Sequence, residues 1–126
     1  GARAKLAESL KQFPIYFDTN SEIVNATGRE KVEAIATLLK ETGAEVQLVA
    51  TGFADNVGNA EYNRQLSLRR AAAVVAGLVA LEIPEENIIT ESKGEDVSRV
   101  SRSERWKARR VEISLAPDPS DTKPEE

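Results

Sequence analysis

The sequence contains no cysteine and no histidine, and each absence excludes a kind of chemistry. Without cysteine the protein has no thiol nucleophile and no disulfide bond, and its redox compartment stays open. Without histidine it lacks the commonest general base and the commonest zinc ligand. A hydrolase would have to use carboxylates, lysine or tyrosine alone. The composition therefore does not favour an enzyme, and we expect no cofactor.

A surplus of positive charge and a long apolar segment are also missing. The 126 residues have a formal net charge of -4 with both signs mixed, which gives no support to nucleic-acid binding. No run approaches the roughly 20 apolar residues of a membrane-spanning helix, and no signal peptide is visible. The opening Gly-Ala-Arg is typical of an excised fragment. We therefore expect contact with a membrane only through parts of a parent protein outside this chain.

Alternating strand and helix patterns predict an α/β (α+β) sandwich with two main helices packed on one sheet. Residues 1–12 are predicted to form a lead-in segment or short helix, 13–116 the domain, and 117–126 a disordered, acidic, proline-rich tail. Strands are expected at 13–18, 45–53, 88–91 and 110–115, with a loop at 93–100. Helices are expected to follow two capping-box patterns, Thr27 to Glu30 and Ser101 to Glu104, and to occupy the segment after the 55–59 loop as far as about residue 81.

Arg70 is the most informative residue, because it lies where a hydrophobic residue is expected. It is four residues from Leu66 and four from Val74 on the apolar stripe of a predicted helix, whereas Arg69 points about a hundred degrees away. A guanidinium beside a core needs a carboxylate partner or an anionic ligand. Asp55, fifteen residues upstream at the end of a predicted strand, could supply the carboxylate. An Asp and an Arg placed together suit a zwitterionic ligand.

Two simpler interpretations of these residues stay open. Asp55 and Arg70 could form a purely structural ion pair, which would be weak evidence for net stability because desolvation offsets most of the attraction. Asp55 could also cap the helix that follows it. The pair Arg109-Arg110, close to acidic residues, is interpreted as a solvated charged face.

Three segments together resemble the signatures of the OmpA-like C-terminal domain family. They are GFADNVG at 52–58, NRQLSLRRA at 63–71 and RRVEI at 109–113. The family signatures read approximately G-x-T-D-x-x-G, N-x-x-L-S-x-x-R-A and R-R-V-E-I, and the resemblance extends from about Pro14 to Leu115. It implies the order β-α-β-α-β-(short α)-β, with a mixed four-stranded sheet.

The resemblance implies a non-catalytic, periplasmic domain that anchors an outer- or inner-membrane envelope protein to peptidoglycan. In this family an Asp and an Arg hold the diaminopimelate residue of the stem peptide. Carried over, Asp55 would pair with the diaminopimelate ammonium and Arg70 with its carboxylate, through two parallel hydrogen bonds. Asn63 would orient the ligand or brace the loop, and Arg110 would lie near the rim. The full set of secondary pocket residues is Asp18, Thr19, Asn20, Asn63 and Arg110. A homodimer is left open.

Three departures from the family pattern indicate an outlying branch. Ala54 replaces the usual Thr, Ser92–Glu95 replaces Gly-x-Gly-Glu without the proline that follows it, and Ala108 replaces the usual Asn. The missing loop consensus and the acidic, proline-rich tail favour a second hypothesis, a protein-interaction or assembly module that no longer binds the wall. A third hypothesis is a glycosidase, because paired carboxylates can hydrolyse glycosides. Its candidate residues are Glu91, Glu95 and Asp96.

Overall fold

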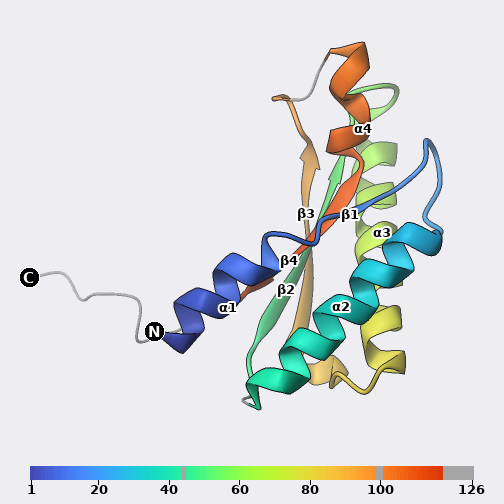
Figure 1. Ribbon diagram of the computed structural model, residues 1–126. Helices are drawn as coiled ribbons and strands as arrows, with labels where there is room; N and C mark the ends of the chain where they lie inside the picture. Colours follow the sequence, from blue (N-terminus) through green and yellow to red (C-terminus); the bar gives the residue numbers. More distant parts are fainter. Residues whose placement is uncertain (44, 99–100, 118–126) are drawn as a thin grey trace, which may run out of the picture.

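The computed structural model describes residues 1–43, 45–98 and 101–117. Two long helices, α2 (Ala26–Thr42) and α3 (Ala60–Ala80), pack on a four-stranded sheet (Figure 1). The strands are β1 (Ile15–Tyr16), β2 (Leu48–Ala54), β3 (Ile88–Glu95) and β4 (Arg110–Leu115). Shorter elements are α1 (Ala2–Leu10), the 3₁₀ helices η1 (Glu85–Asn87) and η2 (Arg102–Glu104), and α4 (Arg105–Ala108). The predicted fold class and element order are confirmed.

The sheet is mixed, with the strand order β1-β4-β2-β3. Strand β2 is interior, as its apolar sequence predicts, and pairs in parallel with β3 and antiparallel with β4. Strand β4 is also interior. Val111 and Ile113 are buried against the helices, whereas Glu112 and Ser114 between and after them are exposed. This is the period-two alternation expected of a sheet with one covered face.

Strand β3 is longer than predicted. The expected strand ended at 91 and a loop began at 93, but the pairing with β2 continues to Glu95. The register shifts where Gly52 pairs with Ser92 and Phe53 with Gly94, so that Lys93 is an extra residue. Gly94 has a φ of 69°, which glycine adopts without steric cost. A half-exposed edge strand needs few apolar residues, and its polar sequence therefore resembled a loop.

Helix α2 begins earlier than its predicted capping box. Its N-cap is Asn25, whose side chain accepts a hydrogen bond from Gly28 N at 2.8 Å, and Thr27 lies within the first turn. The predicted end at Gly43 is confirmed, with a left-handed φ of 69°. The second predicted box is also wrong in detail. Ser101 stands at the N-cap position of η2 but makes no capping hydrogen bond.

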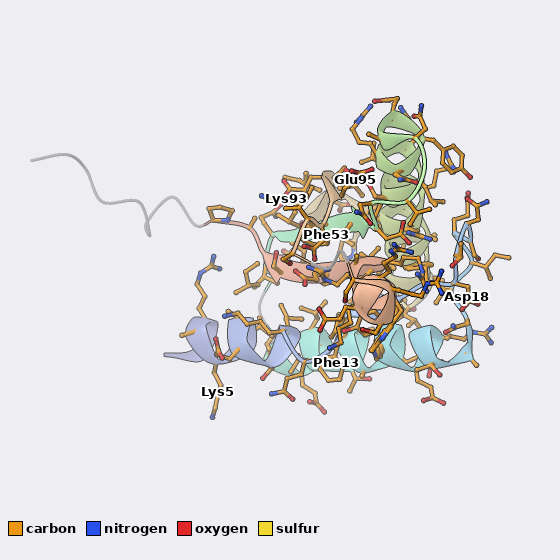
Figure 2. All side chains as sticks on the ribbon, turned by 90° about the horizontal axis from the view of Figure 1, so that it is seen from above. Lys5, Phe13, Asp18, Phe53, Lys93 and Glu95 are labelled. Carbon is orange, nitrogen blue, oxygen red and sulfur yellow. The ribbon has the colours of Figure 1, made fainter. Side chains whose placement is uncertain are left out.

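The predicted N-terminal helix is present as α1 and contributes to the core. Lys5 points outward (Figure 2), whereas Leu6 and Leu10 are buried in the main hydrophobic cluster. Arg3 Nη2 also donates a hydrogen bond of 2.7 Å to the carbonyl oxygen of Ala116. Helix α1 is therefore packed on the same core as α2 and α3. The first strand is shorter than predicted, because it covers only Ile15–Tyr16 and not 13–18.

The close approach of α3 to β2 depends on Gly52. A Cβ atom at this position would overlap the carbonyl oxygen of Ser67, which lies on α3. The Ser67 side chain is fully buried and its Oγ lies 2.6 Å from Ser92 Oγ on β3. These contacts hold the first half of α3 against the carboxyl ends of β2 and β3. They thereby fix the position of Arg70, one turn further along the helix.

Candidate functional site

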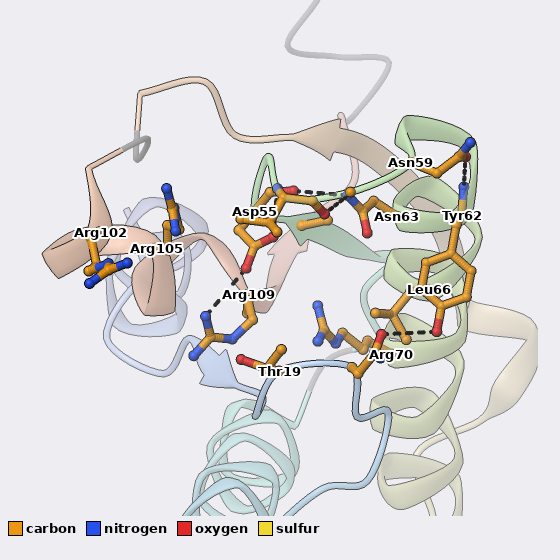
Figure 3. Close-up of a pocket in the computed structure, with 14 residues that line it drawn as sticks. Thr19, Asp55, Asn59, Tyr62, Asn63, Leu66, Arg70, Arg102, Arg105 and Arg109 are labelled. Carbon is orange, nitrogen blue, oxygen red and sulfur yellow. Dashed lines mark hydrogen bonds and ion pairs between the residues drawn. The ribbon is translucent and has the colours of Figure 1, made fainter.

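A pocket of about 470 Å³ lies where the carboxyl end of β2 meets the first turns of α3, the segment after β1, and η2 with α4 (Figure 3). Its lining includes backbone and side chains of four separate parts of the chain. Four arginines face it, and Asp55 is the only carboxylate among the described lining residues. The arginines are Arg70, Arg102, Arg105 and Arg109. The pocket is therefore suited to a ligand with negative charge.

Arg70 lies on the buried stripe of α3, as its spacing predicts, and is only 1% exposed. Its Nε donates to the Ser21 carbonyl at 2.8 Å and its Nη2 to the Asp18 carbonyl at 3.0 Å. The guanidinium also lies 5.4 Å from the centre of the Phe17 ring, within cation–π range. These contacts orient the side chain into the pocket without neutralising its charge.

The charge of Arg70 has no direct carboxylate partner among the described residues. Burial, the largest cause, and the positive charge of Arg109 together lower the pKa of Arg70 to about 10, and the negative charge of Asp55 acts in the opposite direction. At neutral pH the guanidinium is still charged. Nη1 makes no hydrogen bond to a described residue. A buried cation without a carboxylate partner is energetically costly, and an anionic ligand bound at Nη1 would offset that cost.

Asp55 follows β2 directly and lines the same pocket as Arg70. Its ion pair is nevertheless made with Arg109, at 3.4 Å between Oδ2 and Nη1 (Figure 3). Asp55 Oδ1 accepts a hydrogen bond from Val57 N at 3.1 Å, which shapes the loop after the strand. The direct structural pair with Arg70 considered above is therefore absent. Asp55 does not cap α3 either, because Asn59 fills that position.

Asn63 is buried beneath the loop and braces it. Its Nδ2 donates to the carbonyl of Val57 at 2.8 Å and lies 3.3 Å from both the Asp55 carbonyl and Glu95 Oε2. It therefore connects α3 to the loop and to the end of β3. Of the two roles suggested by the resemblance, the contacts fit bracing the loop.

The segment after β1 places two of its three expected residues in the pocket. Thr19 and Asn20 line it, and the Asn20 side chain accepts a hydrogen bond of 3.0 Å from the Tyr62 hydroxyl. Asn20 has a φ of 62°, a left-handed conformation that asparagine tolerates better than most residues. Asp18 contributes through its carbonyl, which holds Arg70, and its side chain does not line the pocket.

Two adjacent arginines, Arg109 just before β4 and Arg110 at its start, do not lie as expected. Arg110 does not line the pocket. It pairs with Asp96 at 2.8 Å and Glu112 at 2.7 Å, and stacks 3.8 Å from the Phe53 ring centre. Arg109 instead faces the pocket, and its Nε donates to the Phe17 carbonyl at 2.9 Å. Interpreting Arg109 and Arg110 as a solvated charged face was wrong, because their side chains are only 17% and 14% exposed and each is paired with a carboxylate.

The three carboxylates of the glycosidase hypothesis have separate partners. Glu91 lies 3.4 Å from the Thr51 hydroxyl, and Glu95 accepts from Asn63. Burial opposes ionisation of Asp96, but hydrogen bonds from Ser98 and Arg110 outweigh it and hold the pKa of Asp96 below its usual value. Over the described ranges there is no group of three acidic side chains arranged to hold a metal ion.

In the described part of the chain, none of the helices combines the length and the apolar character that crossing a membrane requires.

Comparison with known proteins confirms the resemblance. The sequence profile described as the OmpA family matches residues 16–112. An outer membrane protein A of Bordetella avium is 34% identical over 103 residues, covering 79% of this chain and 53% of the relative. Outer membrane protein 41 of Porphyromonas gingivalis is 33% identical over 99 residues, covering 78% of this chain and 25% of the relative. The chain thus spans about half or less of the length of these relatives.

Solved structures show the same fold. The peptidoglycan-associated lipoprotein from Burkholderia pseudomallei superimposes with a TM-score of 0.73 at 24% identity, covering 82% of this chain and 89% of that chain. The C-terminal domain of Helicobacter pylori MotB gives a TM-score of 0.74 at 24% identity, covering 86% of this chain and 87% of that chain. Both matches extend over nearly all of the compared domain.

Proposed function

Because the chain belongs to the OmpA family, we propose that its pocket binds the diaminopimelate residue of the peptidoglycan stem peptide, and that the domain anchors an envelope protein to the cell wall from the periplasm. The observation that carries this proposal is Arg70. It is buried, faces the pocket, and has no carboxylate partner among the described residues. A ligand carboxylate would supply the missing negative charge.

The chemistry of the ligand matches the arrangement of the site. The side chain of diaminopimelate ends in a second amino-acid head group, with an ammonium and a carboxylate on one carbon. The carboxylate would approach the free donor of Arg70, and the ammonium would approach Asp55. Asp55 can accept it while keeping part of its contact with Arg109, because a carboxylate has about four acceptor positions. The peptide would therefore bind without leaving either charge unpaired.

Co-sedimentation with purified diaminopimelate-type sacculi tests the wall-binding function. We expect the wild-type domain to pellet with sacculi and Asp55→Ala to stay in solution. Arg64→Gln is the control, since Arg64 is exposed on α3, pairs with Glu61 and does not line the pocket. Melting temperatures distinguish a lost ligand contact from a lost fold. A folded wild-type domain that stays in solution would contradict the proposal.

A protein-interaction module without wall binding is the second candidate, and one observation favours it. Asp55 already has an ion pair with Arg109, and two Arg70 nitrogens already donate to loop carbonyls. The site is thus partly satisfied without a ligand. Under this hypothesis, Asp55→Ala would lower the melting temperature and neither protein would bind sacculi.

A further inference from the structure

The pocket contains more positive charge than a zwitterionic head group can neutralise. Four arginines and one aspartate line it among the described residues, and a head group with one ammonium and one carboxylate has no net charge. Arg70 and Asp55 account for both of its charges in the proposed function. Arg109 is the internal partner of Asp55. Arg102 and Arg105 are left without a role.

Arg102 and Arg105 lie on η2 and α4, across the pocket from α3 (Figure 3). Neither side chain makes an ion pair with a described carboxylate. The neighbouring Glu104 is 3.9 Å from Lys107 instead. Arg105 Nε is buried and has no hydrogen-bond partner. A buried donor without an acceptor is destabilising, so a ligand anion that drew this guanidinium further into the pocket would remove that cost.

We propose that Arg102 and Arg105, beside Arg109, form a second anionic subsite that binds a further carboxylate of the same ligand. This proposal rests on the proposed function and extends it to the class of peptide bound. A stem tripeptide ending in diaminopimelate has two candidate groups, the α-carboxylate of its γ-linked glutamate and its own C-terminal carboxylate. A pocket of about 470 Å³ has room for more than one amino-acid head group.

Three synthetic tripeptides, measured by isothermal titration, test the subsite. One is L-Ala-γ-D-Glu-meso-diaminopimelate with all carboxylates free, one has the glutamate α-carboxylate amidated, and one has the C-terminal carboxylate amidated. We expect one amidation to weaken binding to the wild type by about tenfold, the effect of losing one charge-assisted hydrogen bond. The sensitive position identifies which carboxylate occupies the subsite.

Paired variants assign this effect to the two arginines. In Arg102→Gln/Arg105→Gln the amidation penalty should fall below about twofold, because the charge that senses the carboxylate is gone. The control Arg29→Gln/Arg64→Gln loses the same charge from exposed positions outside the pocket and should keep the full penalty. Arg102→Lys/Arg105→Lys keeps both positive charges and should keep most of the amidation penalty. This variant distinguishes the effect of lost charge from the effect of a changed fold. Melting temperatures are measured for each variant.

The outcomes separate this proposal from the proposed function. Equal affinity of the wild type for all three peptides, with binding that still requires Arg70, would overturn the subsite alone. If Arg102→Gln/Arg105→Gln lost as much affinity on amidation of the peptide as the wild type does, the subsite would also be overturned. A folded wild type that binds none of the peptides would overturn both proposals together.

Discussion

Arg70 should allow the domain to distinguish diaminopimelate from lysine in otherwise identical stem peptides. Lysine keeps the ammonium but lacks the carboxylate, so the Arg70 charge would be left unpaired in a site where it is 1% exposed. A hydrogen bond to a charged group contributes roughly 1.5–3 kcal/mol. We therefore expect the diaminopimelate peptide to bind about tenfold to a hundredfold more tightly.

The assay is a cycle of four titrations, with wild type and Arg70→Lys each measured against both peptides. A lysine at position 70 keeps the charge but cannot donate to the Ser21 and Asp18 carbonyls and to a ligand in the same fork geometry. The preference for diaminopimelate should fall below about threefold in this variant, a loss of most of the coupling. Arg69→Lys is the matched control, because Arg69 is the adjacent residue and pairs outside the pocket with Glu22.

Two results would refute the reasoning. If the wild type bound both peptides equally, the ligand carboxylate would not reach Arg70. If Arg70→Lys kept the full preference, another cation would read the carboxylate. Arg109 is the neighbouring candidate, since its charge is close enough to lower the pKa of Arg70.

Three further predictions concern stability. Gly52→Ala should destabilise the domain by roughly 1–3 kcal/mol, measured by urea unfolding, because its Cβ meets the backbone of Ser67 and α3 must shift. Asn25→Ala should cost about 1 kcal/mol in the same assay through loss of the α2 cap, and Thr27→Ala much less. The pKa of Asp96 is lower in the folded state than in the unfolded state. Ionised Asp96 therefore stabilises the fold at pH values above its unfolded-state pKa, and this stabilisation is lost as the pH falls through its folded-state pKa. The difference in unfolding free energy between wild type and Asp96→Asn should therefore shrink on acidification.

Controls for these predictions come from the same chain. Gly77→Ala meets only a side-chain carbon of Val32, at 3.2 Å, and should cost less than the Gly52 change. Equal costs at both glycines would contradict the backbone argument. A larger loss of stability from Thr27→Ala than from Asn25→Ala would support the predicted capping box that starts at Thr27. If the difference in unfolding free energy between wild type and Asp96→Asn stayed constant with pH, the contacts of ionised Asp96 would not stabilise the fold.

The parts of the fold that follow local periodicity were predictable from the sequence. The apolar stripe of α3 predicted that Arg70 lies on its buried face, and the alternation of polar and apolar residues predicted the bounds of β4, Arg110–Leu115. The start of α2 was missed because Asn25 and Thr27 are both good caps, and only the backbone conformation distinguishes them. The length of β3 was missed because its exposed edge carries polar residues that are also typical of loops.

The pocket was only partly predictable, because its charges come from segments far apart in the sequence. Asp55 and Arg70 could be identified from local pattern, but the partner of Asp55 is Arg109, 54 residues away. Strand alternation could have shown that Arg109 and Arg110 point to opposite sides. No local signal identified Arg102 and Arg105, since their place in the pocket depends on how η2 and α4 fold back over the sheet.

The packing of α1 has a mechanical consequence for a domain proposed to hold a wall. Its partner β4 ends beside it, where Arg3 donates to Ala116, and β4 is antiparallel to β2, whose carboxyl end carries the pocket. The chain's first helix and the ligand site therefore lie toward opposite ends of the sheet. A tensile force between residue 1 and a bound ligand would first have to break the Arg3 hydrogen bond and extract Leu6 and Leu10 from the core. We expect α1 to detach before the strands separate, so that the pocket keeps its shape while the detached segment extends.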